Sequence, residues 1–210
     1  MAPELASLLS SNRVIPVAQF DDRDSALRTA ELLLKHSMTI LEITFRTANA
    51  AEILRAVAER FPGLTVGAGS VLSADAMNAA VDAGAAFCVA PGFDPSLVGK
   101  AHSRGCGFIP GVATPTEMNA ALNLCDVIKL FPAAQLGGVE YIKAVTAPFK
   151  TKKFHLVPTG GVNRENFLEY LKQDRVIAVG MSWVVDGALV KKGDFAAVEG
   201  RIMDVMRALA

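Results

Sequence analysis

Cysteine and histidine are scarce in this sequence, and neither follows a spacing typical of a structural or metal site. Cys88, Cys106 and Cys125 are an odd number with no Cys-x-x-Cys pair, and each lies in or beside an apolar stretch. The three histidines are scattered, with no spacing that would put two on one face of a helix or strand. These patterns argue against a disulfide framework and against a zinc or iron site. They favour buried, reduced thiols.

An excess of charge of either sign is also missing. The 21 Lys and Arg residues balance 21 Asp and Glu residues, no basic block occurs, and only 7% of the residues are aromatic. Proteins that bind nucleic acid or anionic membranes normally present a basic surface, and single-stranded nucleic acid also needs aromatic side chains on which bases stack. We therefore expect no nucleic-acid or membrane partner and favour a small molecule.

Long hydrophobic runs are absent as well. The apolar stretches fall short of the roughly 20 residues that span a bilayer, and residues 1–11 lack the basic start and apolar segment of a signal peptide. With 51% hydrophobic and 20% charged residues, the chain of 210 residues has the composition of a protein with a large core. We expect one cytoplasmic domain over residues 1–210.

What the sequence does contain is a unit that recurs eight times: a strand-like run, a turn and an alanine-rich amphipathic stretch. After a short helix over residues 3–9, we predict strands at 14–19, 39–45, 65–71, 86–90, 107–111, 127–131, 155–159 and 176–181, with helices between them. Four residues stand where helix N-caps are expected: Asp22, Ser73, Thr114 and Asn163.

Alternating units of this kind give parallel strands with right-handed crossovers. Eight units of roughly 25 residues fit a closed (β/α)8 TIM barrel at the compact end of its size range. The alternative is an open doubly wound sheet. Against it, no Gly-x-Gly-x-x-Gly fingerprint follows the first predicted strand.

One lysine interrupts an apolar run, Asp-Val-Ile-Lys-Leu-Phe-Pro at residues 126–132. In a strand, Val127, Lys129 and Phe131 share one face. An edge strand could hold such a lysine in solvent. A central strand would instead desolvate the ammonium and lower its pKa, which makes the nucleophilic amine accessible. Lys129 is therefore a candidate catalytic nucleophile.

The second predicted strand supplies further charges. Alternation puts Ile40, Glu42, Thr44 and Arg46 on one face of this strand, and Leu41, Ile43 and Phe45 on the other. Because the outer face of a barrel strand packs against helices, the charged pair is expected inside the barrel with Lys129. A structural ion pair is the alternative interpretation of Glu42.

Small residues follow several predicted strands. Gly69 and Ser70 end the third strand, Gly160 and Gly161 follow the seventh, and Ser182 follows the eighth. Glycines after the last two strands, with a helix N-terminus beyond, form the usual phosphate site of this barrel class. A tight loop could need the same glycines for steric reasons alone.

Four motifs in order make the chain resemble the bacterial KDPG/KHG aldolase family over nearly its whole length. They are LEITFRT at residues 41–47, GAGSVL at 67–72, IKLFP at 128–132 and PTGG at 158–161. KDPG is 2-keto-3-deoxy-6-phosphogluconate and KHG is 4-hydroxy-2-oxoglutarate. The resemblance implies a (β/α)8 barrel, commonly a homotrimer, that cleaves its substrate by metal-independent class I chemistry with no cofactor.

The resemblance also implies roles for individual residues. Lys129 would form a Schiff base with the ketose carbonyl, and Glu42 would shuttle protons. Arg46 and Ser70 would bind the pyruvate carboxylate, and Pro91 and Phe131 would line the pyruvyl pocket. Thr159 would contact the aldehyde half of the substrate. The phosphate would be bound by Gly160, Gly161 and Ser182.

The chain departs from the family pattern at two of these positions. Ser70 stands where the family usually has Thr, which keeps the hydroxyl. Met181 stands where the family usually has Gly, so a thioether lies beside the phosphate loop unless its side chain points away.

The sequence favours cleavage of KDPG to pyruvate and glyceraldehyde 3-phosphate. The alternatives are an aldolase for KHG or for the galactonate-derived epimer, and a phosphosugar-binding barrel without turnover. The last of these has no need for Glu42, Arg46 and Lys129 together.

Overall fold

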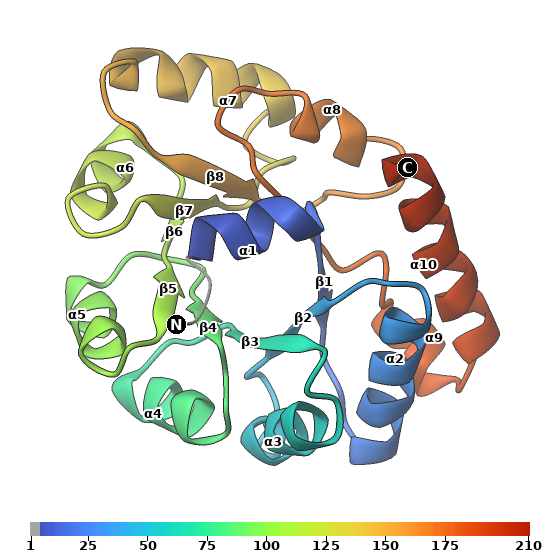
Figure 1. Ribbon diagram of the computed structural model, residues 1–210. Helices are drawn as coiled ribbons and strands as arrows, with labels where there is room; N and C mark the ends of the chain where they lie inside the picture. The colour runs from blue at the N-terminus through green and yellow to red at the C-terminus, as the bar shows by residue number, and fades with distance from the viewer. Residues whose placement is uncertain (1–4) are drawn as a thin grey trace.

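Parallel strands form the centre of the protein and helices surround them in a computed structural model, which describes residues 5–210 (Figure 1). The strands are β1 (Val14–Ala18), β2 (Ile40–Thr44), β3 (Thr65–Gly69), β4 (Phe87–Val89), β5 (Gly107–Ile109), β6 (Gly111–Val112), β7 (Val127–Leu130), β8 (His155–Pro158) and β9 (Val179–Met181). Each predicted strand is confirmed to within three residues at either end, and the fifth is divided in two.

The helices are α1 (Leu5–Asn12), α2 (Arg23–Lys35), α3 (Ala50–Arg60), α4 (Ala74–Asp82), α5 (Pro95–Ser103), α6 (Pro115–Ala121), α7 (Gly138–Thr146), the 3-10 turn η1 (Ala147–Phe149), α8 (Phe167–Leu171), α9 (Gly187–Lys191) and α10 (Phe195–Leu209). The predicted first helix is confirmed from Leu5 onward, and its first two residues lie outside the described part. None of the helices over residues 5–210 has the length and apolarity needed to cross a bilayer.

Neighbouring strands are consecutive in the chain from β1 to β5 and from β6 to β8, and the last strand, β9, pairs with the first. One sheet has the order β5-β4-β3-β2-β1-β9, a second has the order β6-β7-β8, and every pair in both is parallel. In a doubly wound sheet several strands follow on the far side of the first strand, whereas here only the last strand, β9, lies there. The predicted α/β class with parallel strands is confirmed.

The predicted continuous eight-stranded ring is not what the hydrogen bonds describe, because the strands divide into sheets of six and three. Pro110 separates β5 from β6, and proline has no N–H to donate to a ladder. Its carbonyl still accepts from the N–H of Lys129 at 2.8 Å. Between β8 and β9 only isolated bridges occur, Leu156 with Val176 and Thr159 with Gly180.

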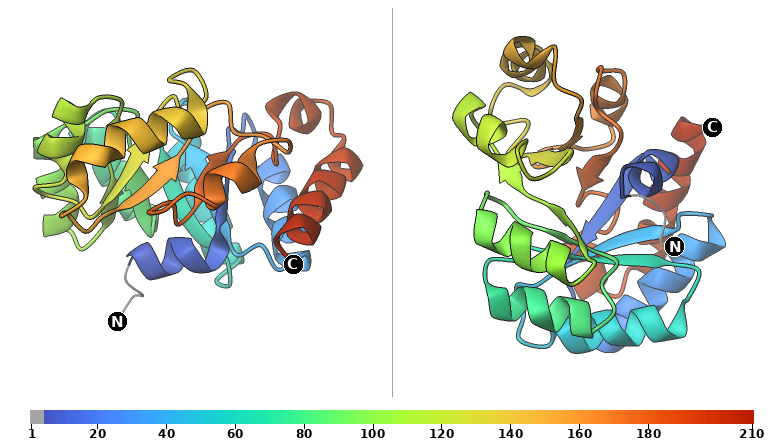
Figure 2. Two further views of the ribbon diagram at one scale, coloured as in Figure 1. Left: turned by 90° about the horizontal axis from the view of Figure 1, so that it is seen from above. Right: turned by 60° about the vertical axis from the view of Figure 1, so that its left-hand side comes forward.

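Side chains on the inner face of the strands form two layers. The layer at the amino ends is apolar and consists of Ile15, Ile40, Phe87, Val89, Ile109, Val127, Val157 and Ala178, together with Leu9 from α1. Figures 1 and 2 show α1 lying across this end of the strands. Above that floor the inner residues are polar, and they include Glu42, Thr44, Lys129 and Thr159, all of which are buried. This layering brings charged groups together at the carboxyl ends of the strands.

The outer strand faces pack against the helices, as alternation predicts. Leu41, Ile43, Ile128 and Leu130 belong to this outer core. Three of the four predicted N-caps accept a backbone N–H at the start of a helix: Asp22, Ser73 and Thr114. The fourth prediction is wrong, because Asn163 lies in a turn where its N–H donates to the side-chain oxygen of Asn166, and α8 starts only at Phe167.

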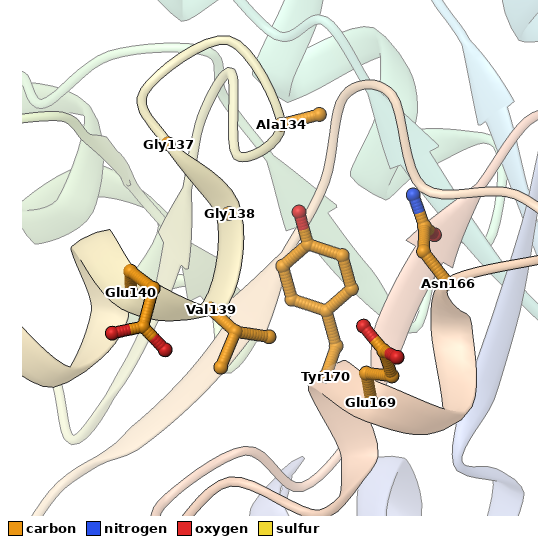
Figure 3. Close-up of a pocket in the computed structure, with 8 residues that line it drawn as sticks. All are labelled: Ala134, Gly137, Gly138, Val139, Glu140, Asn166, Glu169 and Tyr170. Atoms are coloured by element: carbon orange, nitrogen blue, oxygen red, sulfur yellow. The ribbon is translucent and has the colours of Figure 1, made fainter.

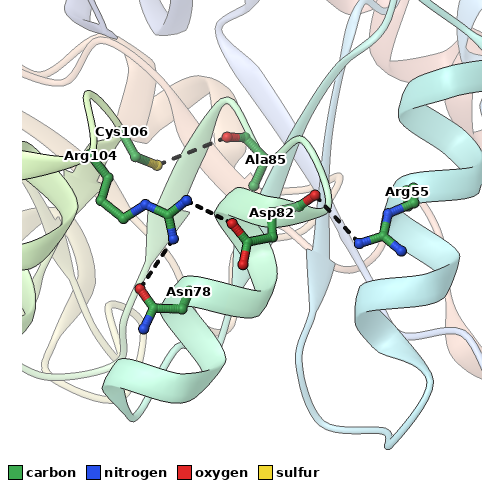
Figure 4. Close-up of polar contacts among 6 residues, drawn as sticks. All are labelled: Arg55, Asn78, Asp82, Ala85, Arg104 and Cys106. Carbon is green, nitrogen blue, oxygen red and sulfur yellow. Dashed lines mark hydrogen bonds and ion pairs between the residues drawn. The ribbon is translucent and has the colours of Figure 1, made fainter.

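Polar contacts join the outer helices between α3 and α5. Figure 4 shows Arg104, just after α5, donating to Asp82 at 2.6 Å and to Asn78 at 3.3 Å, while Arg55 from α3 reaches the carbonyl of Asp82. Nearby, the thiols of Cys88 and Cys106 are buried 3.8 Å apart. All three cysteines are reduced, but Cys125 is only half-buried, so the prediction of buried thiols holds for two of them.

Candidate active site

A cavity of about 290 Å³ opens at the carboxyl ends of the strands. Its lining is Val17, Glu42, Thr44, Arg46, Ser70, Lys129, Phe131, Thr159, Gly160, Gly161, Val162, Gly180 and Ser182. Every predicted site residue except one therefore lines a single cavity. The exception is Pro91, which follows β4 and is half-buried, with its carbonyl against Gly111.

Lys129 points into this cavity from β7 and is 6% exposed. Its Nζ lies 4.9 Å from the centroid of the Phe131 ring. Burial lowers the pKa of Lys129 from its ordinary 10.5, Glu42 opposes that change and Arg46 adds to it. Burial outweighs the nearby carboxylate, because water that would solvate an ammonium is replaced by strand backbone and apolar side chains. The amine is therefore available in its neutral, nucleophilic form at lower pH than an exposed lysine.

Glu42 lies on β2 and is 3% exposed. Burial raises the pKa of its carboxyl group above 4.5, while Lys129 and Arg46 act in the opposite direction. The two pKa shifts favour the neutral carboxylic acid of Glu42 and the neutral amine of Lys129. A structural ion pair would instead favour both charges, so the arrangement suits proton transfer better than it suits electrostatic stabilisation.

The position of the Glu42 carboxyl group depends on Gly69 of β3. A Cβ atom at residue 69 would overlap Oε1 of Glu42, so only glycine leaves room for this carboxyl group. We expect Gly69→Ala to displace this carboxyl group. For the expected cleavage of KDPG, kcat should fall about 10²-fold, the usual cost of misplacing a catalytic group by about 1 Å. Steady-state kinetics of the variant checks this. Gly99→Ala is the matched control, since a Cβ there meets nothing within 4 Å; equal kcat values for the two variants would contradict the steric argument.

Arg46 and Ser70 meet at the rim of the cavity. The guanidinium Nε donates to the Ser70 hydroxyl at 2.9 Å, and Ser70 adopts a left-handed conformation with φ 57°. This bond uses one of the five N–H donors of the guanidinium. The two predicted residues thus lie together in the lining of the cavity, with the remaining guanidinium donors free of this bond.

Gly160 and Gly161 form the opposite rim, with φ angles of 94° and 73°. A Cβ at Gly161 would overlap that of Ala134, so this turn needs glycine for packing as well as for conformation. The predicted helix N-terminus directly behind the loop is wrong, because a turn over residues 163–166 separates it from α8. Any anion here would rely on backbone N–H groups and the exposed hydroxyl of Ser182.

Met181 is fully buried in the outer core. Alternation along β9 turns Gly180 inward and Met181 outward against the helices, so the thioether does not line the cavity. The departure from the family pattern therefore leaves the glycine rim unobstructed.

Four lining residues were not predicted: Val17, Thr44, Val162 and Gly180. Alternation did place Thr44 on the face of Glu42, which was the available signal for it. Gly180 is explained by packing, because a Cβ there would overlap Oγ1 of Thr159.

A second hollow, of about 550 Å³, lies between α7 and α8 and is open to solvent. Figure 3 shows its lining of Ala134, Gly137, Gly138, Val139, Glu140, Asn166, Glu169 and Tyr170. It contains no amine and no guanidinium. Of these two hollows, only the smaller and more enclosed one holds a buried amine, Lys129, with a buried carboxyl group, Glu42.

The sequence matches the family model for KDPG and KHG aldolase over residues 5–201. The chain belongs to the KDPG and KHG aldolase family. A 2-dehydro-3-deoxy-phosphogluconate aldolase from Treponema pallidum is 38% identical over 187 residues, which are 89% of this chain and 88% of that protein. The KHG/KDPG aldolase of Escherichia coli K12 is 33% identical over 190 residues, which are 90% of this chain and 88% of that protein.

A crystal structure of the KDPG aldolase from Legionella pneumophila has the same fold. Its TM-score is 0.90 at 31% identity, and the match covers 97% of this chain and 98% of that one. Pyruvate was captured in that crystal at low pH as a covalent carbinolamine intermediate. The predicted family is therefore confirmed, and one member of this KDPG and KHG aldolase family joins pyruvate covalently to the protein.

Proposed function

We propose that this protein is a class I aldolase that cleaves KDPG to pyruvate and glyceraldehyde 3-phosphate. The observation that carries the proposal is the buried amine of Lys129, with its pKa lowered, beside the buried acid Glu42 in the cavity at the strand ends. Family membership supplies the reaction class, since relatives bear the name of this aldolase.

In the proposed reaction the neutral amine of Lys129 attacks the ketone carbon of KDPG and forms a carbinolamine. Loss of water then gives a protonated imine. When the C3–C4 bond breaks, its electron pair moves toward this imine as an enamine, and the C4 hydroxyl loses its proton as the aldehyde forms. Glu42 takes this proton and returns one to C3 of the enamine, and hydrolysis of the resulting imine then releases pyruvate and restores the amine of Lys129. The imine stabilises the electron pair that a metal ion would stabilise in the other aldolase class.

Binding of the pyruvyl half is assigned to the rim opposite the glycines. The Arg46 guanidinium, held by Ser70, presents a planar pair of donors that matches the two oxygens of a carboxylate. Phe131 covers the amine. Pro91 remains a proposed contact of the pyruvyl group on the family resemblance alone, since it does not line the cavity.

The aldehyde half then extends toward β8 and β9. Thr159 is the proposed contact to its hydroxyl groups, and the phosphate is assigned to backbone N–H groups of Gly160 and Gly161 and to Ser182. These residues share the lining of the cavity with Lys129. KHG, which has no phosphate, would use the same pyruvyl contacts and is a second proposed substrate.

The proposed function also includes the closure of the barrel and the oligomeric state. We infer that the two sheets close into one (β/α)8 barrel through Pro110 and the bridges between β8 and β9. One such domain over residues 1–210, working in the cytoplasm as a homotrimer, agrees with the family resemblance.

The proposal is tested by measuring kcat/KM for KDPG, for its galactonate-derived epimer and for KHG. The highest value is expected for KDPG. Turnover of the epimer alone would shift the assignment to the sibling enzyme, and binding of all three without turnover would support the non-catalytic alternative.

The pH dependence of imine formation follows from the lowered pKa of Lys129. Because only the neutral amine reacts, the rate of trapping with pyruvate and cyanoborohydride should increase with pH. It should reach half of its maximum at a pH below 10.5. Mass spectrometry follows the reduced adduct. Nα-acetyl-lysine amide is the solvated control and should titrate near 10.4. A half-maximum at or above the value of the control would contradict the effect of burial.

A further inference from the structure

Thr44 is the starting point of a further inference. It is 4% exposed, and among residues 5–210 its Oγ1 is the one buried side-chain nitrogen or oxygen without a hydrogen-bond partner. Buried hydroxyls normally have a partner, and leaving one unpaired is destabilising. Thr44 is one of the residues that line the Lys129 cavity, so a reacting molecule in the cavity can supply the partner.

The surroundings of Thr44 indicate which atom that partner is. Thr44 is the register neighbour of Gly69, and the Glu42 carboxyl group occupies the space where a Cβ of Gly69 would stand. Glu42 therefore reaches along β2 to the level of Thr44. An oxygen that exchanges a proton with Glu42 lies beside the Thr44 hydroxyl.

We propose that Thr44 is a further catalytic residue, whose hydroxyl holds the reacting oxygen that exchanges a proton with Glu42. This inference rests on the proposed function and adds a residue to it. Arg46 and Ser70 lie further toward the rim and are assigned to the pyruvate carboxylate, so neither takes this place.

The step concerned is the dehydration of the carbinolamine. The nitrogen lone pair forms the C=N bond as the C–O bond breaks, and the departing oxygen takes a proton from the carboxylic acid of Glu42 and leaves as water. Thr44 holds that oxygen by a hydrogen bond throughout. In the reverse direction it holds the water that hydrolyses the imine while Glu42 accepts the proton.

Thr44→Val tests the proposal because it replaces the hydroxyl with a methyl group of similar shape. We expect kcat for KDPG and the rate of pyruvate imine formation to fall about 10- to 100-fold, with KM changed less than threefold. The melting temperature of the free protein should rise by about 2–4 °C, because the unpaired polar group is gone. Thr44→Ser keeps the hydroxyl and should recover most of the rate.

Thr29→Val is the matched control. Thr29 is fully buried in α2, but its hydroxyl donates to the carbonyl of Ser25 at 2.8 Å, away from the cavity. Its loss should leave kcat unchanged and should not raise the melting temperature.

The outcomes separate the two proposals. A wild-type protein that neither cleaves KDPG nor forms an imine with pyruvate overturns the proposed function and the role of Thr44 together. An active wild type with a Thr44→Val variant of equal kcat overturns the role of Thr44 alone. A Thr44→Val variant that loses stability and activity together, with no rescue by serine, shows a structural role and also overturns it.

Discussion

Lys129→Met is expected to abolish aldol cleavage, with kcat falling on the order of 10⁶-fold, as when other enzymes lose their covalent nucleophile. Without the amine no imine forms, and the electron pair released from the C3–C4 bond has nothing to stabilise it. Methionine suits the site because Lys129 is buried beside Phe131, and an unbranched apolar side chain of similar length fills the same space.

The measurement is steady-state cleavage of KDPG, together with borohydride reduction in the presence of pyruvate and mapping of the adduct by mass spectrometry. Lys153→Met is the control, since Lys153 is exposed and lies outside the cavity. A pyruvate adduct on a different lysine in the wild type, or normal turnover by Lys129→Met, would refute the assignment of the nucleophile.

Glu42→Gln should lower kcat by about 10²–10⁴, the usual contribution of a positioned acid or base, with a small change in KM. Glutamine keeps the shape of the side chain against Gly69 but can neither release nor accept the proton that the reaction moves. Because burial raises the pKa of Glu42, the acid form that protonates the leaving hydroxyl persists at higher pH than for an exposed glutamate.

Kinetics on KDPG checks the size of this effect, and Glu140→Gln on the exposed start of α7 provides the control. A near-normal kcat for Glu42→Gln would remove Glu42 from proton transfer. A large increase in KM at unchanged kcat would make it a binding residue instead.

Alternation along single strands predicted much of the site. It placed Lys129 with Val127 and Phe131, and Glu42 with Arg46, on the inner faces that the structure shows, because the period of a strand is fixed by backbone geometry. The direction of the pKa shifts could not be predicted. It depends on whether burial or the neighbouring charge has the larger effect, and only the packed structure decides that.

Contacts between neighbouring strands could not be predicted from the sequence either. Gly69 gave a general signal for close approach, but nothing local shows that the approaching group is the Glu42 carboxyl. The unpaired hydroxyl of Thr44 is likewise visible only when every neighbour is known. The division of the sheets at Pro110 and the late start of α8 depend on hydrogen bonds that residue type alone did not specify.

The apolar floor formed with Leu9 of α1 affects the order of events during turnover. Among residues 5–210 this apolar layer fills the amino end of the strands, so in the proposed reaction water, substrate and both products use the opening at the carboxyl end. The proposed imine would hold the pyruvyl group on Lys129 in the buried polar layer, behind the aldehyde half. The aldehyde must therefore depart first, and the water that frees pyruvate enters by the path the aldehyde has just vacated. One sealed end is enough to turn a two-product cleavage into an ordered sequence.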